Sequence, residues 1–126
     1  EIVDFLTIGA NAQIFRNEFG ATLRNNGLLS FTTNIKPENL GTLINNGSLL
    51  VRVPMTNSGA LTLAAGSNFD FSGATLNNGG TINLQRNFTF GAAVSGAVNL
   101  SAGGTVVNSA LLTNSAGYWL DNFGTL

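Results

Sequence analysis

Six carboxylates are the side chains in this sequence that are best suited to acid–base chemistry. They are Glu1, Asp4, Glu18, Glu38, Asp70 and Asp121. Two acids that flank a glycosidic bond can cleave it, and Asp70 with Asp121 is the pair that folding could bring together. No two of the six share an expected strand face, so we interpret Asp70 and Asp121 as solvent-facing or turn residues. The sequence predicts no catalytic residue and no enzyme, with a carbohydrate-active enzyme as the alternative.

The residue types that other common chemistries require are missing. The chain has no cysteine and no histidine, which excludes a thiol nucleophile and removes the usual general base and zinc ligand. Serine has no histidine partner for a hydrolase triad. Calcium-binding glycine repeats carry Asp in each turn, whereas the turns here carry Asn. We therefore expect no cofactor and no metal.

The composition is poor in charge. Charged residues make up 9% of the chain and hydrophobic residues 44%, against about 25% charged residues in an average soluble domain. The surface must then consist of Asn, Ser, Thr and Gly, or be covered by other subunits. The five basic residues are scattered at Arg16, Arg24, Lys36, Arg52 and Arg86. They form no basic patch, so we expect no nucleic-acid binding, and no apolar run is long enough to predict membrane insertion.

One unit recurs along the chain: an apolar residue, a spacer, Asn-Asn or Asn-Ser, Gly, and then alternating apolar residues. Residues 41–65 contain it twice, and the other copies start at Leu23, Thr75 and, in degraded form, Val106. The fourth copy has an extra Gly80, which we expect to shift the register as a bulge would. The alternation after each Gly is typical of a β-strand with one buried face.

The repeated asparagines and glycines are the predicted turn and ladder residues. They are Asn25, Asn45, Asn57, Asn77 and Asn108, with Gly27, Gly47, Gly59 and Gly79. Asn and Gly tolerate the positive φ that short turns between strands require. The glycine spacings of 20, 12 and 20 residues are uneven, and they favour neither a solenoid nor a sandwich.

The N-terminal residues differ from the rest and divide the chain into 1–19 and the repeat-built domain 20–126. Residues 1–19 are rich in large apolar side chains and predict a cap over the core. The alternative is a strand exchanged with another subunit. The candidate assembly residues are Ile2, Phe5, Ile8, Ile14 and Phe15.

The chain predicts an all-β fold of ten to twelve short strands with no helix of ordinary length. Pro37 predicts a turn between repeats, and Pro54 predicts a corner or strand end. A short β-solenoid, the right-handed β-helix, is the first choice, with stacked asparagines at the turns and an inward ladder of Leu29, Leu49, Leu61 and Ile82. A β-sandwich or jelly roll is the alternative, because it produces the same alternation without stacking.

Two phrases, GTLINNGSLLV (41–51) and GATLNNGGTINL (73–84), resemble the L-x-N-x-G-x-L repeats of secreted bacterial β-helix proteins. Filamentous haemagglutinin-type adhesins and autotransporter passengers are such proteins, and the resemblance covers residues 20–113 in broken form. It implies a right-handed β-helix, export, and a role in adhesion or a surface layer. The uneven coil lengths depart from that pattern. The chain resembles the β-rich shafts of phage tail fibres more loosely.

These observations predict a structural, self-associating protein outside the cell or on a cell or virion surface. Its main partner would be itself, as a homo-oligomer or filament, since low charge and exposed strand edges favour such contacts. A trimeric phage tail-fibre or other virion appendage is the first alternative, and a carbohydrate-active β-helix enzyme is the second. A surface polysaccharide is a second candidate partner, through the neighbouring aromatics Tyr118 and Trp119.

Overall fold

The computed structural model describes residues 1, 5–8, 14–71, 74–86, 88–90, 97–100, 105–108, 112–114 and 120–122. Within these residues the chain forms seventeen strands and no helix, so the all-β prediction is confirmed. The strands are β1 (Phe5–Ile8), β2 (Ile14–Asn17), β3 (Thr22–Asn25), β4 (Leu28–Phe31), β5 (Lys36–Asn39), β6 (Thr42–Asn45), β7 (Ser48–Val51), β8 (Met55–Asn57), β9 (Ala60–Leu63), β10 (Asn68–Asp70), β11 (Thr75–Asn78), β12 (Thr81–Leu84), β13 (Phe88–Phe90), β14 (Ala97–Leu100), β15 (Thr105–Asn108), β16 (Leu112–Asn114) and β17 (Leu120–Asn122).

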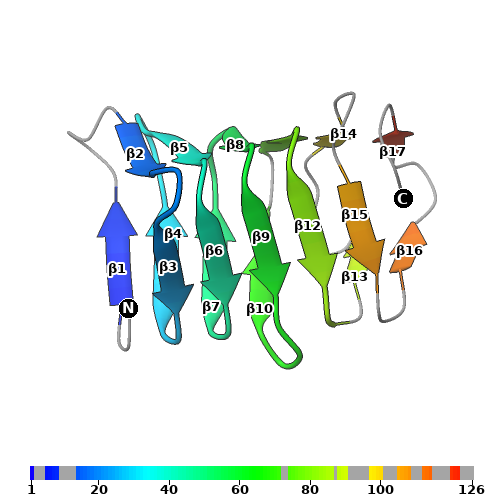
Figure 1. Ribbon diagram of the computed structural model, residues 1–126, viewed down its shortest axis with the longest axis horizontal. Coiled ribbons are helices and arrows are strands. Elements are labelled where there is room, and N and C mark those ends of the chain that lie inside the picture. The colour runs from blue at the N-terminus through cyan, green and yellow to red at the C-terminus, as the bar shows by residue number, and fades with distance from the viewer. Residues whose placement is uncertain are drawn as a thin grey trace.

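The described strands pair in parallel and build three main sheets along one axis (Figure 1). Sheet I has the order β1-β4-β7-β10, sheet II the order β17-β14-β11-β8-β5-β2, and sheet III the order β15-β12-β9-β6-β3. Strands β13 and β16 form a further parallel pair. Because every third strand returns to the same sheet, the chain winds as a β-solenoid. This confirms the predicted solenoid and excludes the sandwich, whose sheets are antiparallel.

The winding is right-handed. In Figure 1 the chain advances from left to right, while the strands of sheet III run downward in front and those of sheet I run upward behind. Sheet II closes the third side and leads the chain from sheet I back to sheet III. Stacked asparagines of neighbouring coils are 18 to 22 residues apart in sequence, so each coil consists of three short strands and their corners.

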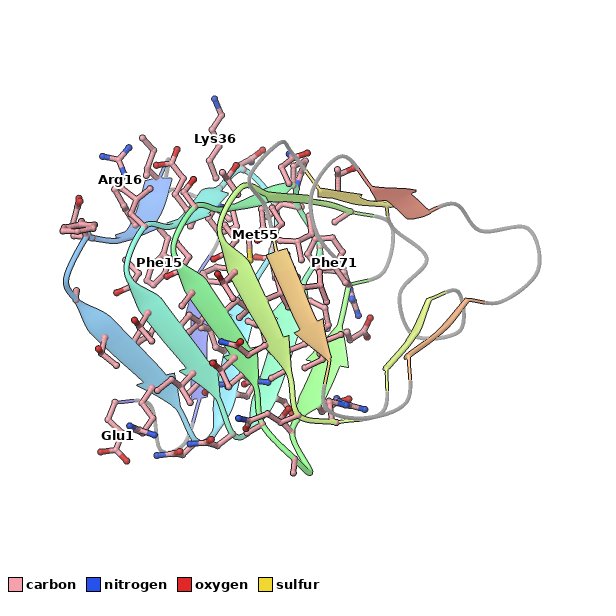
Figure 2. The ribbon with its side chains drawn as sticks, turned by 45° about the vertical axis from the view of Figure 1, so that its right-hand side comes forward. Glu1, Phe15, Arg16, Lys36, Met55 and Phe71 are labelled. Carbon is pink, nitrogen blue, oxygen red and sulfur yellow. The ribbon has the colours of Figure 1, made fainter. Side chains whose placement is uncertain are left out.

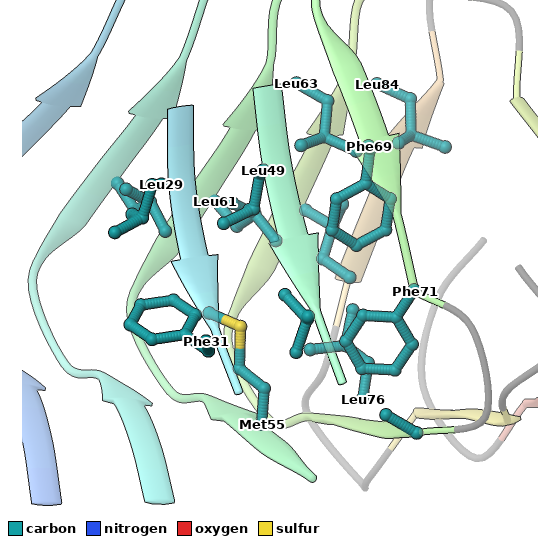
Figure 3. Close-up of a cluster of buried hydrophobic side chains, with 14 of the residues drawn as sticks. Leu29, Phe31, Leu49, Met55, Leu61, Leu63, Phe69, Phe71, Leu76 and Leu84 are labelled. Atoms are coloured by element: carbon teal, nitrogen blue, oxygen red, sulfur yellow. The ribbon is translucent and has the colours of Figure 1, made fainter. Parts of the chain in front are cut away.

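The core fills the space between the three sheets with columns of apolar side chains (Figure 3). In sheet III, Leu43 pairs with Leu61 and Leu61 with Ile82. In sheet I, Leu29 pairs with Leu49 and Leu49 with Phe69. The predicted single ladder of Leu29, Leu49, Leu61 and Ile82 is therefore two columns on facing sheets. Each fully buried side chain of this kind stabilises the fold by about 1.5–3 kcal/mol relative to exposure.

The uneven glycine spacing comes from two kinds of corner in each coil. Asn25-Asn26-Gly27 and Asn45-Asn46-Gly47 form the corner between sheets III and I, while Asn57-Ser58-Gly59 lies at the corner between sheets II and III. The spacing of 20 thus joins equivalent corners of successive coils, and the spacing of 12 joins different corners. Each coil has three short strands, and the described residues form seventeen strands, so ten to twelve strands was too low an estimate.

Pro37 lies inside β5, a central strand of sheet II, so the prediction of a turn there is wrong. Its missing N–H is tolerated because the pairing of β5 with β8 starts only at Glu38 and Thr56. Pro54 precedes β8 directly, at the strand end where it was predicted. In the described residues, the backbone pairing of β5 with β8 is therefore short at the end where the two prolines lie.

Candidate assembly surface

A buried ladder of asparagine side chains runs along one corner of the solenoid. The Nδ2 of Asn17 donates to the Oδ1 of Asn39 at 2.7 Å, Asn39 donates to Asn57 at 2.6 Å, and Asn57 to Asn78 at 2.6 Å. All four side chains are at most 8% exposed. Each is the last inward residue of its strand in sheet II. The ladder satisfies amide groups that burial would otherwise leave unpaired.

A shorter ladder lies at the next corner, in sheet III. The Nδ2 of Asn25 donates to the Oδ1 of Asn45 at 2.7 Å and to the carbonyl of Ser48 at 2.7 Å. Beyond Asn45 the same register position holds Leu63 and then Leu84. The column therefore changes from a polar ladder to an apolar one within the same sheet. Asparagine amides also bond the corner carbonyls, as Asn45 does with the carbonyl of Asn68 at 2.9 Å.

Glycines stack at the corners because there is no room for a side chain. A Cβ on Gly47 would lie 2.2 Å from the carbonyl oxygen of Gly27, and one on Gly59 would lie 2.0 Å from that of Gly41. The glycines with positive φ among the described residues are Gly20 and Gly66. The prediction that positive φ explains the corner glycines is therefore wrong. The corners are bends between sheets of one coil, and the close approach of the next coil requires glycine.

The structure places the predicted ladder residues in three different ways. Asn25 and Asn45 stack on each other, and Asn57 belongs to the other ladder. Asn77 is half-buried on the outer side of β11, while its neighbour Asn78 occupies the ladder position beside Asn57. Asn108 is in register with Leu84, and its side chain lies outside the described residues.

Several ladder residues were missed by the sequence pattern. They are Asn17, Asn39, Asn78, Gly41 and Gly80. The bulge predicted from Gly80 does not occur, because Gly80 stacks on Gly59 and Gly79 meets open space. The signal that finds Asn17 and Asn39 is an Asn two residues after an inward apolar position, at a spacing of 22 residues. Neither Asn17 nor Asn39 belongs to an Asn-Asn-Gly unit, so that pattern does not identify them.

The predicted assembly residues start the solenoid. Phe5 and Ile8 lie on β1, which pairs with β4, and Ile14 and Phe15 lie on β2, which pairs with β5. Ile14 is 55% exposed, whereas Phe15 packs against Phe31 with ring centroids 5.0 Å apart. Ile2 lies outside the described residues. Strands β1, β2 and β3 are the outermost strands of their sheets, and no described strand pairs with their outer edges.

A turn beside this end carries the most exposed large apolar side chain of the described part. Ala21 N–H bonds the carbonyl of Glu18 at 3.0 Å, and Gly20 has a φ of 79° at the third turn position. This turn adds two residues to a corner that has only Leu40 and Gly41 in the next coil. Phe19 is 91% exposed as a result. Exposed edges and an exposed aromatic side chain therefore lie at the same end of the solenoid.

Two ion pairs join neighbouring coils on the outer surface. Arg16 Nε lies 2.7 Å from Glu38 Oε2, and Arg52 bonds both carboxylate oxygens of Asp70 at 3.0 and 2.9 Å. Hydrogen bonding to the carboxylate is the main reason that the pKa of Arg16 and the pKa of Arg52 are raised. Figure 2 shows Arg16 and Lys36 pointing away from the core and Met55 pointing into it. Such exposed pairs add little stability, because solvent and salt screen them.

The acidic pair considered for glycoside cleavage is separated by the fold. Asp70 lies on β10 of sheet I and Asp121 on β17 of sheet II. Asp70 is held by Arg52 in a two-point contact. Among the described residues, no group of three or more acidic, histidine or cysteine side chains is placed to hold a metal ion. Nor do these residues include a helix with the length and hydropathy needed to cross a membrane.

A shallow groove of about 700 Å³ opens where the backbone pairing between β5 and β8 is short. Its lining residues are Ile14, Asn34, Ile35, Lys36, Pro37, Glu38, Val53, Pro54 and Thr56. The lining is mixed, and it contains one base and one acid but no aromatic ring. An aromatic platform for a sugar ring is therefore lacking in this groove. Tyr118 and Trp119, the residues considered for sugar binding, lie outside the described residues.

No protein-family model, curated protein or solved structure matches this chain. Its function is therefore inferred from the solenoid, its ladders and its outer edges.

Proposed function

We propose that this chain is a structural subunit that associates with copies of itself end to end, as the building block of a filament or adhesin-type scaffold outside the cell or on its surface. One observation carries the proposal. The three parallel sheets share one axis and have outer strands β1, β2 and β3 with free outer edges among the described residues. Parallel strands stacked on such an edge continue the sheets, and a head-to-tail contact of this kind does not close.

Composition supports the same proposal. A chain with 9% charged residues offers little electrostatic repulsion between copies. The described residues lack the acidic, histidine or cysteine clusters that a metal site would need. The resemblance of the repeats to haemagglutinin-type and autotransporter-passenger β-helix proteins favours a surface adhesin over an enzyme. A trimeric fibre remains distinguishable, because a closed trimer stops growing at three copies.

The outer edge of β2 offers a direct test. The carbonyl of Asn17 accepts from Leu40 N–H at 2.9 Å, so Phe15 and Asn17 turn their backbone groups toward β5. Backbone groups alternate along a strand, so Ile14 and Arg16 present theirs at the outer edge. Ile14→Pro removes one outer N–H without touching the bonds between β2 and β5. Proline is tolerated at the first residue of a strand.

Sedimentation velocity over a concentration series measures the effect. We expect the unmodified chain to form species that grow with concentration. Ile14→Pro should weaken association about 3- to 10-fold, the equivalent of one hydrogen bond. Ile14→Ala is the matched control, because it removes the exposed side chain and keeps the N–H. A monomer at every concentration, or a species that stops at three copies, contradicts the proposal.

A further inference from the structure

At three register positions, the two outermost strands of sheet II carry residues that are chemically compatible with each other. The ladder position reads Asn17, Asn39, Asn57, Asn78, Leu100 and Asn122 from β2 to β17. The column therefore starts and ends with asparagine. In the adjacent column, β2 has Phe15, and β17 has Leu120 in register with Val98 and Leu76. Both columns have chemically compatible residues at the outermost strands of the sheet.

The asparagine ladders have a direction. In every side-chain bond of the buried ladders, the Nδ2 of one coil donates to the Oδ1 of the following coil. The first Oδ1 of each ladder therefore receives no donor from the described chain. The Oδ1 of Asn25 is buried with no hydrogen-bond partner, and in the described hydrogen bonds Asn17 donates through its Nδ2. The N-terminal end thus presents acceptors that suit amide donors from a preceding coil.

The register column of Arg16 shows charge complementarity between the two ends of sheet II. It reads Arg16, Glu38, Thr56, Asn77, Asn99 and Asp121. Arg16 is paired with Glu38 on the side of its own next coil and has its other side at the free edge of β2. The guanidinium side chain is 40% exposed. A head-to-tail stack places the position of Asp121 directly on that free side.

From these three columns we infer that β17 of one copy pairs in parallel with β2 of the next copy. The register is Leu120 on Phe15, Asp121 on Arg16 and Asn122 on Asn17. An apolar contact, an opposite-charge pair and an asparagine ladder then continue across the junction, as they do between coils inside the chain. Among the described strands, sheet II ends with β17 and sheet III with β15, so β17 is the outermost described strand of sheet II on the side opposite β2.

This inference rests on the proposed end-to-end association, and disulfide trapping separates the two. The chain has no cysteine, so two single-cysteine variants can be mixed without side reactions. We choose Arg16→Cys and Asp121→Cys. Neighbouring strands lie about 4.8 Å apart, within the Cα separation of about 4.4–6.8 Å that a disulfide spans. The two variants differ in mass, so mass spectrometry distinguishes the mixed dimer from like–like dimers.

The mixed dimer of Arg16→Cys with Asp121→Cys should dominate on mild oxidation. The matched control replaces Arg16→Cys with Arg24→Cys, an exposed arginine on β3 of sheet III. We expect at least about fivefold less mixed dimer in that control, since the disulfide distance range is narrow. Equal yields in the two mixtures, while the unmodified chain still sediments as an oligomer, overturn the inferred register alone. A monomeric chain with no preferred disulfide overturns both the register and the end-to-end association.

A charge reversal tests the same junction without cysteine. Asp121→Lys leaves the pair between Arg16 and Glu38 in place and brings a second positive charge to Arg16 of the next copy. We expect association to weaken about fivefold at low salt relative to Asp121→Asn, and the difference to shrink at about 0.5 M salt, because salt screens exposed charges. Equal association of the two variants at low salt contradicts the inferred register.

Discussion

Asn39 and Asn57 are joined by an amide–amide hydrogen bond of 2.6 Å at the centre of the longer ladder, with both side chains at most 1% exposed. Asn39 also donates to the carbonyl of Ala60, so its side-chain amide bonds both a side chain and a backbone carbonyl of the next coil. The same pattern repeats with Asn17 and with Asn57. The register of sheet II is therefore fixed by side chains as well as by the backbone.

Asn57→Leu should destabilise the chain by about 2–4 kcal/mol, because Asn39 and Asn78 would each face an apolar group where an amide partner was. Leucine fits this kind of position elsewhere, at Leu63 and Leu84, where its neighbour in the column is also leucine. Urea denaturation followed by circular dichroism measures the change. Asn46→Ala is the control, since Asn46 bonds Asn26 on the exposed surface, and it should cost less than about 1 kcal/mol. Equal losses in both variants contradict a structural role for burial of the ladder.

Gly59→Ala and Gly79→Ala should differ sharply in their effect on stability, although both glycines follow the Asn-Ser or Asn-Asn pair of their copy of the unit. A methyl group on Gly59 would meet the carbonyl of Gly41 at 2.0 Å, whereas one on Gly79 meets nothing within 4 Å. We expect Gly59→Ala to cost at least about 1–3 kcal/mol through overpacking, and Gly79→Ala to be close to neutral. Thermal denaturation of both variants checks this. Similar melting temperatures would show that the coils are not stacked as closely at this corner.

Leu61→Ala should remove about 2–5 kcal/mol, because Leu61 is fully buried between Leu43 and Ile82 and leaves a cavity. Ile44→Ala is the matched control on the neighbouring strand, where Ile44 is half-buried on the outer face of sheet III. It should cost less than about 1.5 kcal/mol, since only part of the side chain loses contacts. A larger loss at Ile44 than at Leu61 would reverse the assignment of inner and outer faces.

The stability of the chain should be nearly independent of pH around neutrality. The pKa values of Arg16 and Arg52 are raised, so each guanidinium keeps its proton across neutral pH. The contribution of this proton to stability is lost far above neutrality, as pH rises through the raised arginine pKa. The sequence has no histidine or cysteine, the side chains whose ordinary pKa values lie nearest neutrality. Melting temperatures at about pH 6 and pH 9 should agree within about 2 °C. A drop of more than about 5 °C across that range contradicts this prediction.

The sequence predicted the fold class and part of the ladder for identifiable physical reasons. Alternation at Leu29, Leu49, Leu61 and Ile82 marked inward faces correctly, because a strand repeats every two residues. The pairing of Asn25 with Asn45 followed from their equal positions in the repeat. Both features are periodic in the sequence itself: one repeats every two residues along a strand, and the other recurs at the same position in two copies of the unit.

The remaining features depend on contacts between coils, which local pattern does not record. Asn77 and Asn78 fit the unit equally well, and only the register with Asn57 selects Asn78. The corner glycines were attributed to positive φ, but the carbonyl of the preceding coil is what excludes a side chain. Pro37 was read as a break in the strand, although the short ladder between β5 and β8 accommodates it. Each difference is a property of stacking, which requires the coils to be aligned first.

Electron microscopy of the purified chain across a concentration series tests end-to-end association most directly. We predict unbranched filaments one solenoid wide, whose length increases with concentration and decreases in Ile14→Pro relative to Ile14→Ala. Dispersed single particles at every concentration, or compact particles with three-fold symmetry and no growth, would contradict the proposed assembly.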